Sequence, residues 1–312
     1  MTKSVFQELQ NLTTEARNAD TMRLDAMSVR EILEAMNRED RMVAEAVAQA
    51  IPQIEKAVEL VVSALASGGR LIYVGAGTSG RLGILDAAEC PPTFSSEPWQ
   101  VQGFIAGGHG AVFRAVEGAE DDEEQAVRDI EVCCINKNDV VCGITASRRT
   151  PYVISALRHA SINDAKRIFI ICNTAPDDAA EFADVVISVP VGPEVLTGST
   201  RLKAGTATKL VLNMLTTAAM VRLGKCYENL MVDLKAGSQK LKARARRIFM
   251  ELTGSDYEWA DEVLKQASGE LKTALVMHFR GVDAEKARAL LEECQGVVRK
   301  VIERIHTGKD SR

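Results

Sequence analysis

Residues 71–81 read LIYVGAGTSGR, and this stretch decides the fold because an apolar run passes directly into a loop of glycines and hydroxyl side chains. Four more short apolar runs rich in Val and Ile follow, at residues 101–105, 140–144, 168–172 and 185–189. They show little polar alternation, which is typical of parallel strands that are buried on both faces.

Helical segments are expected between most of these strands and after the last one, around residues 79–87, 110–131, 151–161, 177–183 and 200–223. Strands and helices in alternation are typical of a sheet whose two faces are both covered by helices. The sequence therefore predicts an α/β fold with a doubly wound, mostly parallel five-stranded sheet.

Helical regions flank the predicted sheet on both sides. Residues 1–25 are expected to form a loop-like arm, Ser28 with Glu31 forms a capping box, and an amphipathic helix is expected over 40–67. After Lys240 the pattern predicts charged helices around 239–252, 256–278 (with a break at Gly269) and 283–306. We therefore expect three parts: an N-terminal arm with helices (1–66), the sheet domain (67–238) and a small helical C-terminal domain (239–312).

Composition narrows the class of protein. The chain has 312 residues, 46% of them hydrophobic, and Lys+Arg 38 against Asp+Glu 43 gives a formal net charge of −5. The net charge is negative, whereas nucleic-acid-binding proteins usually have an excess of basic residues. The first residues lack a signal-peptide core, the apolar runs are too short to span a bilayer, and the seven cysteines form no C-x-x-C pair. We expect a cytoplasmic protein without nucleic-acid or membrane partners.

The loop after the first strand is a candidate phosphate site formed by Gly77, Thr78, Ser79 and Gly80. Glycines allow close backbone approach, the hydroxyls donate hydrogen bonds, and the following helix offers free N–H groups to an anion. The spacing of the glycines also fits the dinucleotide pattern G-x-G-x-x-G, but the second strand ends in Ala106-Gly107-Gly108 rather than in an acidic residue. The sequence favours a phosphomonoester, and a tight turn without a ligand remains an alternative.

Hydroxyl side chains recur after the third strand and before the long helix. Ser147 and Thr150 follow the third strand, and Thr150 precedes Pro151, a residue that favours the first position of a helix. Ser199 belongs to a third cluster, at the start of the helix that contains Lys203. Capping alone would explain one such turn, but three favour binding, so all four residues are candidate phosphate ligands.

Two glutamates are candidates for chemistry. Glu89 precedes Pro91 and Pro92, where we expect the helix to end, and Glu120 follows a glycine-rich turn. An isolated glutamate near a helix end is usually just solvated, so the residues alone do not decide. The four histidines are scattered without the spacing of metal ligands, so the sequence predicts neither a metal nor another cofactor.

Five long motifs stand out in the chain: LTTEARN (12–18), LIYVGAGTSGRLGILDAAECPPTF (71–94), TPYVISAL (150–157), TGSTRLKAGTATKLVLNM (197–214) and NLMVDL (229–234). They resemble motifs of the N-acetylmuramic acid 6-phosphate etherases, which belong to the sugar isomerase (SIS) superfamily. The resemblance covers essentially the whole chain. It implies a SIS-type sheet that binds a small sugar phosphate.

The resemblance also implies a reaction. These etherases cleave the lactyl ether at C3 of the sugar, by elimination and then water addition, and release N-acetylglucosamine 6-phosphate and D-lactate. An open-chain aldehyde acidifies the C2 proton, so one carboxylate can remove that proton while a protonated one donates to the leaving oxygen. By similarity Glu89 is the proton donor, and Glu120 is the candidate second acid/base.

One departure from the family pattern lies in the third-strand loop, where Arg148 replaces a glycine of A-S-G-R-T-P-Y. If that glycine has a positive φ, arginine costs roughly 1–2 kcal/mol there. Its guanidinium could instead add a contact to the phosphate.

The distance between Ser79 and Glu89 along the predicted helix favours a homodimer. A regular helix from Ser79 would place Glu89 about 15 Å along its axis, farther than the reacting carbons can lie from their own phosphate. Either the helix ends near Leu85 and the chain folds back, or a second subunit supplies the carboxylate. The helices over 40–67 and 200–223 have apolar faces long enough for an interface.

Two other functions remain open. One is a sugar-phosphate sensor that resembles vertebrate glucokinase regulatory protein, which binds without cleaving but carries two SIS domains. The other is an aldose–ketose isomerase, which needs only proton transfer. The intact D-A-A-E-C-P-P motif at residues 86–92 favours the etherase.

Overall fold

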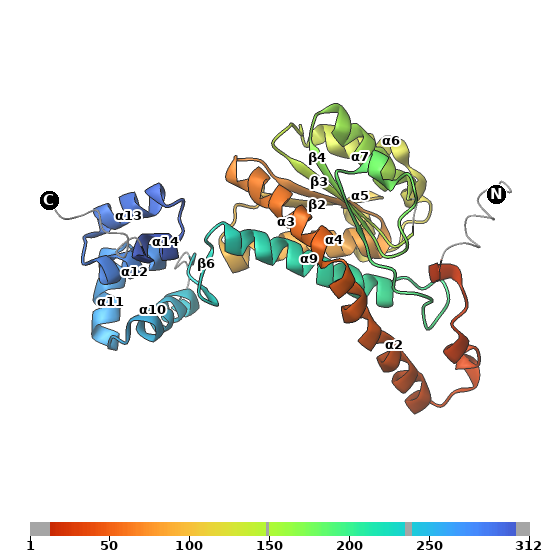
Figure 1. Cartoon of the computed structure of the whole chain (residues 1–312), viewed down its shortest axis with the longest axis horizontal. Coiled ribbons are helices and arrows are strands. Elements are labelled where there is room, and N and C mark those ends of the chain that lie inside the picture. Colours follow the sequence, from red (N-terminus) through yellow and green to blue (C-terminus); the bar gives the residue numbers. More distant parts are fainter. Residues whose placement is uncertain (1–12, 148–149, 235–238, 304–312) are drawn as a thin grey trace. The chain divides into compact units, whose positions relative to one another are not determined.

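The computed structural model describes residues 13–147, 150–234 and 239–303. These residues form two compact units (Figure 1). One unit contains residues up to Glu89 together with Glu97–Thr217, and the other contains Cys90–Ser96 and residues from Ala218 onward. The three-part division at residues 66 and 238 stays a prediction.

The first unit is built on a five-stranded parallel sheet, as predicted. Its strands are β1 (Leu71–Gly75), β2 (Val101–Ile105), β3 (Val140–Thr145), β4 (Lys166–Ile171) and β5 (Val185–Ser188). They pair in the order β2-β1-β3-β4-β5, and every pair is parallel. All residues of β1 and β3 are buried, which explains why these strands show no polar alternation.

Helices cover both faces of the sheet, so the doubly wound class is confirmed (Figure 1). One face carries α3 (Ile51–Ala66), α4 (Gly77–Phe94) and α9 (Lys203–Arg222). The other carries α6 (Glu123–Val132), α7 (Pro151–Ile162) and α8 (Ala179–Phe182), whose buried side chains share one core cluster with alternate residues of the strands.

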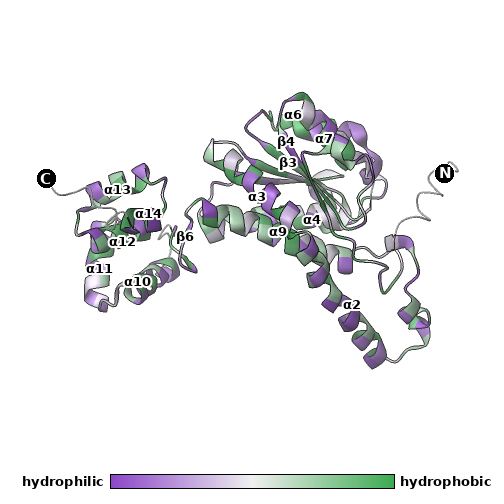
Figure 2. Cartoon of the chain, in the orientation of Figure 1, coloured by the Kyte–Doolittle hydropathy of each residue, from purple (hydrophilic) through white to green (hydrophobic). Residues whose placement is uncertain are grey.

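The N-terminal region differs in part from the expectation. Ser28 and Glu31 do form the predicted capping box at the start of α2 (Val29–Gln49). The expected single helix over 40–67 is instead interrupted at Ala50, because Pro52 lacks an N–H group and lies in the first turn of α3. Helix α2 extends away from the sheet and carries hydrophilic and hydrophobic residues along its length (Figure 2). The described part of the arm contains short 3-10 turns at Thr13–Glu15, Ala19–Thr21 and Leu24–Ala26.

The expected helix over 110–131 is divided as well. It consists of α5 (Gly108–Phe113), a 3-10 turn (Ala119–Asp121) and α6. Gly118 has a φ of +76° between them, and the Asp122 carboxylate accepts a hydrogen bond from the N–H of Gln125 to begin α6. This division places Glu120 in a turn instead of within a helix.

The second unit is mainly helical. Its helices are α10 (Gln239–Thr253), α11 (Tyr257–Gln266), α12 (Leu271–Arg280), α13 (Ala284–Glu293) and α14 (Val298–Glu303), and a short hairpin is formed by β6 (Cys226–Tyr227) and β7 (Leu230–Met231). Gly269, with a φ of +81°, separates α11 from α12 as predicted, and Asp283 caps α13. Within the described residues, no helix is long and apolar enough to cross a membrane.

Candidate active site

The cavity that collects most of the predicted phosphate ligands lies at the carboxyl ends of β1 and β3. The strand order changes direction there, because β1 has β2 on one side and β3 on the other. In open parallel sheets, ligands bind at such a switch point. The cavity has a volume of about 280 Å³, and its lining includes Gly77, Thr78, Ser79, Ser147, Thr150 and Glu120.

The loop after β1 contributes a helix N-terminus to this cavity. Helix α4 begins at Gly77, so the N–H groups of Gly77, Thr78 and Ser79 have no acceptor within the helix and are available to an anion, whereas the N–H of Gly80 donates to the carbonyl oxygen of Ala76. The φ of Gly77 is +53°, a conformation that favours glycine. Gly80 does not line the cavity. A Cβ there would lie 2.6 Å from the carbonyl oxygen of Gly75, so Gly80 allows α4 to pack closely against β1.

The loop after β3 contributes a set of connected hydroxyls. The buried Thr145 lies at the end of the strand, and its Oγ1 is 2.7 Å from Thr150 Oγ1 and 3.2 Å from Ser147 Oγ. Thr150 is the N-cap residue of α7, but its side chain makes no capping hydrogen bond. These hydroxyls are therefore held at the cavity by one another rather than by the helix end. Arg148 lies outside the described residues.

Of the two predicted catalytic carboxylates, Glu120 lines the cavity and Glu89 does not. Glu120 is exposed in the turn after Gly118. Glu89 is exposed on α4, and this helix continues without interruption to Phe94. About 15 Å of helix axis therefore separates Glu89 from the first turn of α4.

The expectation that the double proline, or a fold-back near Leu85, ends this helix was wrong. Pro91 and Pro92 both lie inside α4. A proline fixes φ near −65°, which is compatible with a helix, and the cost is a lost N–H donor and steric pressure on the preceding turn. The side chains of Cys90 and Phe94, on either side of the two prolines, are buried, so packing holds this part of α4. Helical hydrogen bonding also continues past the prolines, because the N–H of Ser95 donates to the carbonyl oxygen of Pro91, 3.0 Å away.

Only part of the third hydroxyl cluster, residues 197–200, lines the cavity. Gly198 and Thr200 line the cavity, whereas Ser199 does not. The N-terminus of α9 is already occupied by a carboxylate of the chain, because Glu194 accepts hydrogen bonds of 3.0 Å from the N–H groups of Lys203 and Ala204. Burial raises the pKa of Glu194, while these two hydrogen bonds oppose the shift.

Lys203 does not reach the cavity. Its side chain is buried, and Nζ forms an ion pair with the carboxylate of Glu39 on α2. Its role as a phosphate ligand stays a prediction that this geometry does not favour. A lysine one turn beyond a hydroxyl cluster suggested phosphate binding from the sequence, and no local pattern revealed its distant partner.

Four polar residues of the lining were not predicted from the sequence: Thr14, Glu15, Thr145 and Thr200. Thr200 lies in the motif 197–214 and Thr145 directly follows the predicted third strand, so both could have been found by extending the same hydroxyl argument. Thr14 and Glu15 come from the N-terminal arm, and nothing in its composition indicated a position beside the sheet.

Several curated proteins with similar sequences are named N-acetylmuramic acid 6-phosphate etherase. An N-acetylmuramic acid 6-phosphate etherase of Geobacillus thermodenitrificans is 55% identical over 95% of this chain and 100% of its own length. A second etherase, from Bacillus cytotoxicus, is 53% identical over 94% of this chain and 100% of its own length. The chain belongs to the N-acetylmuramic acid 6-phosphate etherase family.

Two SIS-domain models match parts of this etherase-family chain. A SIS domain model matches residues 122–218, and a model of the glucokinase regulatory protein N-terminal SIS domain matches residues 53–161. Among solved structures, a phosphoheptose isomerase from Neisseria gonorrhoeae is 18% identical, with a TM-score of 0.46, over 60% of this chain and 99% of that chain.

The family motif D-A-A-E-C-P-P begins with Asp86, a buried residue on the side of α4 that faces the sheet. Asp86 accepts hydrogen bonds from the hydroxyls of Tyr73 on β1, at 3.0 Å, and Thr216 on α9, at 3.2 Å. Burial raises the pKa of Asp86 above its ordinary value, although these two hydrogen bonds and the charge of Lys209 oppose the shift. In this etherase-family fold, Asp86 thus joins the helix that carries Glu89 to the sheet and to α9.

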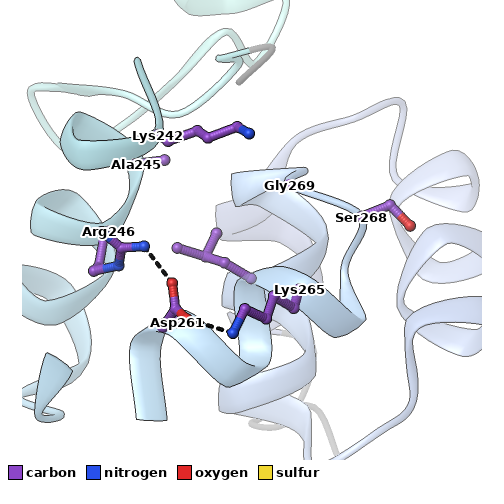
Figure 3. Close-up of a pocket in the computed structure, with 8 residues that line it drawn as sticks. Lys242, Ala245, Arg246, Asp261, Lys265, Ser268 and Gly269 are labelled. Atoms are coloured by element: carbon purple, nitrogen blue, oxygen red, sulfur yellow. Dashed lines mark hydrogen bonds and ion pairs between the residues drawn. The ribbon is translucent and has the colours of Figure 1, made fainter. Parts of the chain in front are cut away.

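The second unit holds another cavity, of about 590 Å³ (Figure 3). Three basic side chains line it: Lys242, Arg246 and Lys265. Asp261 pairs with both Arg246 and Lys265, and the Arg246 guanidinium also lies over the ring of Tyr257. These charges are largely paired among themselves, whereas hydroxyls and helix N–H groups line the first cavity.

Metal ligands do not gather in the part of the chain that the structure describes: no group of three or more His, Cys, Asp and Glu side chains there is arranged to hold an ion. The cavity lining instead offers hydroxyls, N–H groups and two carboxylates.

Proposed function

We propose that this chain cleaves the lactyl ether of N-acetylmuramic acid 6-phosphate and releases N-acetylglucosamine 6-phosphate and D-lactate. One observation carries the proposal: the chain is 55% identical, over 95% of its length, to a protein named for this etherase activity. The cavity supports it, because hydroxyls and a helix N-terminus suit a phosphomonoester and Glu120 supplies a carboxylate at the same place.

The proposed reaction begins from the open-chain sugar. Its C1 aldehyde acidifies the proton on C2, and a carboxylate removes that proton while the C3–O bond to lactate breaks. A protonated carboxyl group gives its proton to the departing lactate oxygen. Water then adds to C3 of the unsaturated aldehyde: the ionised proton donor takes a proton from the water, and the other carboxyl group returns its proton to C2, which restores both groups. We assign the proton donor to Glu89 and the second acid/base to Glu120.

The phosphate is proposed to bind at Ser79 and Ser147, with N–H groups of the first turn of α4 directed at it. Thr78 and Thr150 complete this set of hydroxyls, and Gly77 leaves the backbone open to the anion. Gly80 contributes indirectly, by allowing the close packing of α4. Ser199 and Lys203 are also proposed as phosphate ligands. Their support is weaker, because neither residue lines the cavity and Lys203 pairs with Glu39.

We further propose that the active unit is a homodimer in which Glu89 acts in the site of the other subunit. An uninterrupted α4 supports this, because Glu89 lies far from the first turn of its own helix. Leu85 lies one turn before Glu89 on the same face of α4, and this hydrophobic side chain is 43% exposed. On α2, Val29 and Leu33 are also exposed hydrophobic residues. A second copy of the chain would cover such surfaces.

The cytoplasm is the proposed location, in keeping with a phosphorylated substrate and a chain for which no membrane-spanning helix was found among the described residues. A sugar-phosphate sensor is the second candidate, because the glucokinase regulatory protein model matches residues 53–161.

The decisive experiment is to incubate the purified protein with N-acetylmuramic acid 6-phosphate and to measure D-lactate with a lactate dehydrogenase. Release of D-lactate with the other product in equal amounts supports the etherase. Tight binding without release of lactate would favour the sensor. Conversion of an aldose phosphate to a ketose phosphate would favour an isomerase.

A further inference from the structure

The N-terminal strap, which we define as residues 13–21, lies against loops that follow β4 and β5. Asn173, just after β4, holds the first part of the strap through two hydrogen bonds. Thr13 Oγ1 donates to Asn173 Oδ1 over 3.1 Å, and Asn173 Nδ2 donates to Thr14 Oγ1 over 3.3 Å. Thr14 is buried. The strap is therefore attached to the surface of the first unit by buried side chains rather than lying there as a loose arm.

Three more hydrogen bonds attach the strap to the loop after β5. The N–H of Gly198 donates to the carbonyl oxygen of Thr14 over 3.3 Å. Farther along, Asn18 Nδ2 donates to the carbonyl oxygen of Pro193, and Thr21 Oγ1 donates to that of Val195 over 2.8 Å. Because contacts hold the strap on both sides of Glu15, the position of the Glu15 backbone is fixed.

Glu15 lines the same cavity as Ser79, Ser147 and Glu120. Its carboxylate has no hydrogen-bond or ion-pair partner among the described residues, and its side chain is exposed. Gly198 lies beside it: a Cβ at that position would be 3.3 Å from Glu15 Oε2. The φ of Gly198 is +78°, so glycine both permits this backbone conformation and leaves room for the carboxylate.

An ionised carboxylate only accepts hydrogen bonds, and it repels a phosphate dianion. Glu15 must therefore face a part of the substrate that donates hydrogen bonds. A sugar phosphate offers hydroxyl groups on the carbons next to the phosphate ester, within one or two bonds of it. The cavity thus combines a part that suits the anion, at Ser79 and Ser147, with a carboxylate that suits the sugar.

We propose that Glu15 is a specificity-determining residue, which accepts a hydrogen bond from a hydroxyl of the bound sugar and so distinguishes a sugar phosphate from other phosphates. The inference deepens the proposed function, and it rests on that function only for its kinetic test. The strap holds Glu15 in place, and the chemistry remains with the catalytic carboxylates.

The kinetic test compares Glu15→Gln and Glu15→Ala with the wild type. Loss of one hydrogen bond to a carboxylate is expected to raise KM roughly tenfold in Glu15→Ala, with a smaller rise in Glu15→Gln because the amide oxygen still accepts. The kcat value should change by less than about threefold, because the proposed contact of Glu15 is with a sugar hydroxyl and not with the reacting atoms. Asp20→Asn is the matched control, since it removes an equal charge from an exposed position of the strap outside the lining.

The binding test separates recognition of the sugar from the structure of the strap. Calorimetry measures the affinities of wild type and Glu15→Ala for inorganic phosphate and for N-acetylglucosamine 6-phosphate. We expect weaker binding of the sugar phosphate, whereas binding of phosphate is unchanged or stronger because a negative charge has been removed.

Two outcomes overturn the inference: equal loss of both affinities, which indicates a structural role, and unchanged affinity for the sugar phosphate. A wild type that binds the sugar phosphate but releases no lactate would contradict the proposed function alone, and the calorimetric comparison would still test Glu15.

Discussion

Ser79 and Glu89 lie on one uninterrupted helix, α4, with about 15 Å of helix axis between them. Ser79 lines the cavity at the switch point of the sheet, and Glu89 is exposed farther along. A hexose 6-phosphate is too short to contact both residues of the same chain, since roughly 5–7 Å separates its reacting carbons from its phosphate. This relationship leads to the first two predictions.

Replacement of either carboxylate should abolish lactate release while leaving sugar-phosphate binding in place. Glu89→Gln and Glu120→Gln keep the shape of the side chain but remove the ionisable proton, so kcat should fall by roughly 10²-fold or more. Steady-state assays with N-acetylmuramic acid 6-phosphate measure the loss, and calorimetry with N-acetylglucosamine 6-phosphate measures binding. Near wild-type turnover of Glu89→Gln would remove this residue from the mechanism.

Mixing two inactive variants should restore activity if the site is shared between subunits. A subunit with Glu89→Gln keeps its phosphate loop, and a subunit with Ser79→Ala keeps its Glu89, so each mixed dimer has one complete site. Random exchange should give about a quarter of the wild-type rate. The control pair, Ser79→Ala with Ser147→Ala, damages every phosphate site and should stay inactive. A fully active monomer would contradict the shared site.

Lys203→Met should destabilise the protein rather than weaken phosphate binding. It leaves the buried carboxylate of Glu39 without its partner, at a cost of about 3–5 kcal/mol in the free energy of unfolding. Urea unfolding measures this, and Lys56→Met, at an exposed position of α3, should change the value by less than about 0.5 kcal/mol. A stable Lys203→Met protein with strongly reduced affinity for inorganic phosphate would instead restore Lys203 as a ligand.

Asp86 should make stability depend on pH. Its pKa is raised by burial, so the protonated form is favoured in the fold, and the contribution present below the ordinary value of 3.8 is lost as the pH rises through the folded-state pKa. Asp86→Asn cannot ionise. The unfolding free energy of the wild type minus that of Asp86→Asn should therefore decrease as the pH rises from about 4 toward neutrality. A difference that stays constant across urea titrations in this range would contradict the raised pKa.

Chelators should leave the activity unchanged. The proposed chemistry needs only carboxylates, hydroxyls and N–H groups, so dialysis against EDTA is expected to preserve the rate of lactate release. Activity that is lost in EDTA and restored by one divalent cation would contradict a metal-independent site.

The sheet and the two main loops of the cavity could be predicted from the sequence because their signals are local. Buried parallel strands show as continuous apolar runs, and Ser79 and Ser147 each follow such a strand directly. Since parallel strands end at one edge, two loops far apart in sequence were correctly expected to meet there. The capping box at Ser28 is equally local and was correct.

The remaining features depend on contacts that no local pattern contains. Pro91 and Pro92 normally end a helix, yet packing carries α4 through both. Lys203 looked like a phosphate ligand, but its partner Glu39 lies 164 positions earlier in the chain. Glu15 belongs to a polar arm whose position beside the cavity depends on loops almost two hundred residues later.

That distance has a consequence for how the protein is made. Asn18 and its partner Pro193 are 175 positions apart, so the strap leaves the ribosome long before the loop that anchors it. At roughly 5–20 residues per second, it waits on the order of ten seconds or more for that loop to be synthesised. The strap can therefore be anchored only after the fifth strand and the loop that follows it have been made, and ribosome-bound chains that end before residue 193 should lack substrate selectivity.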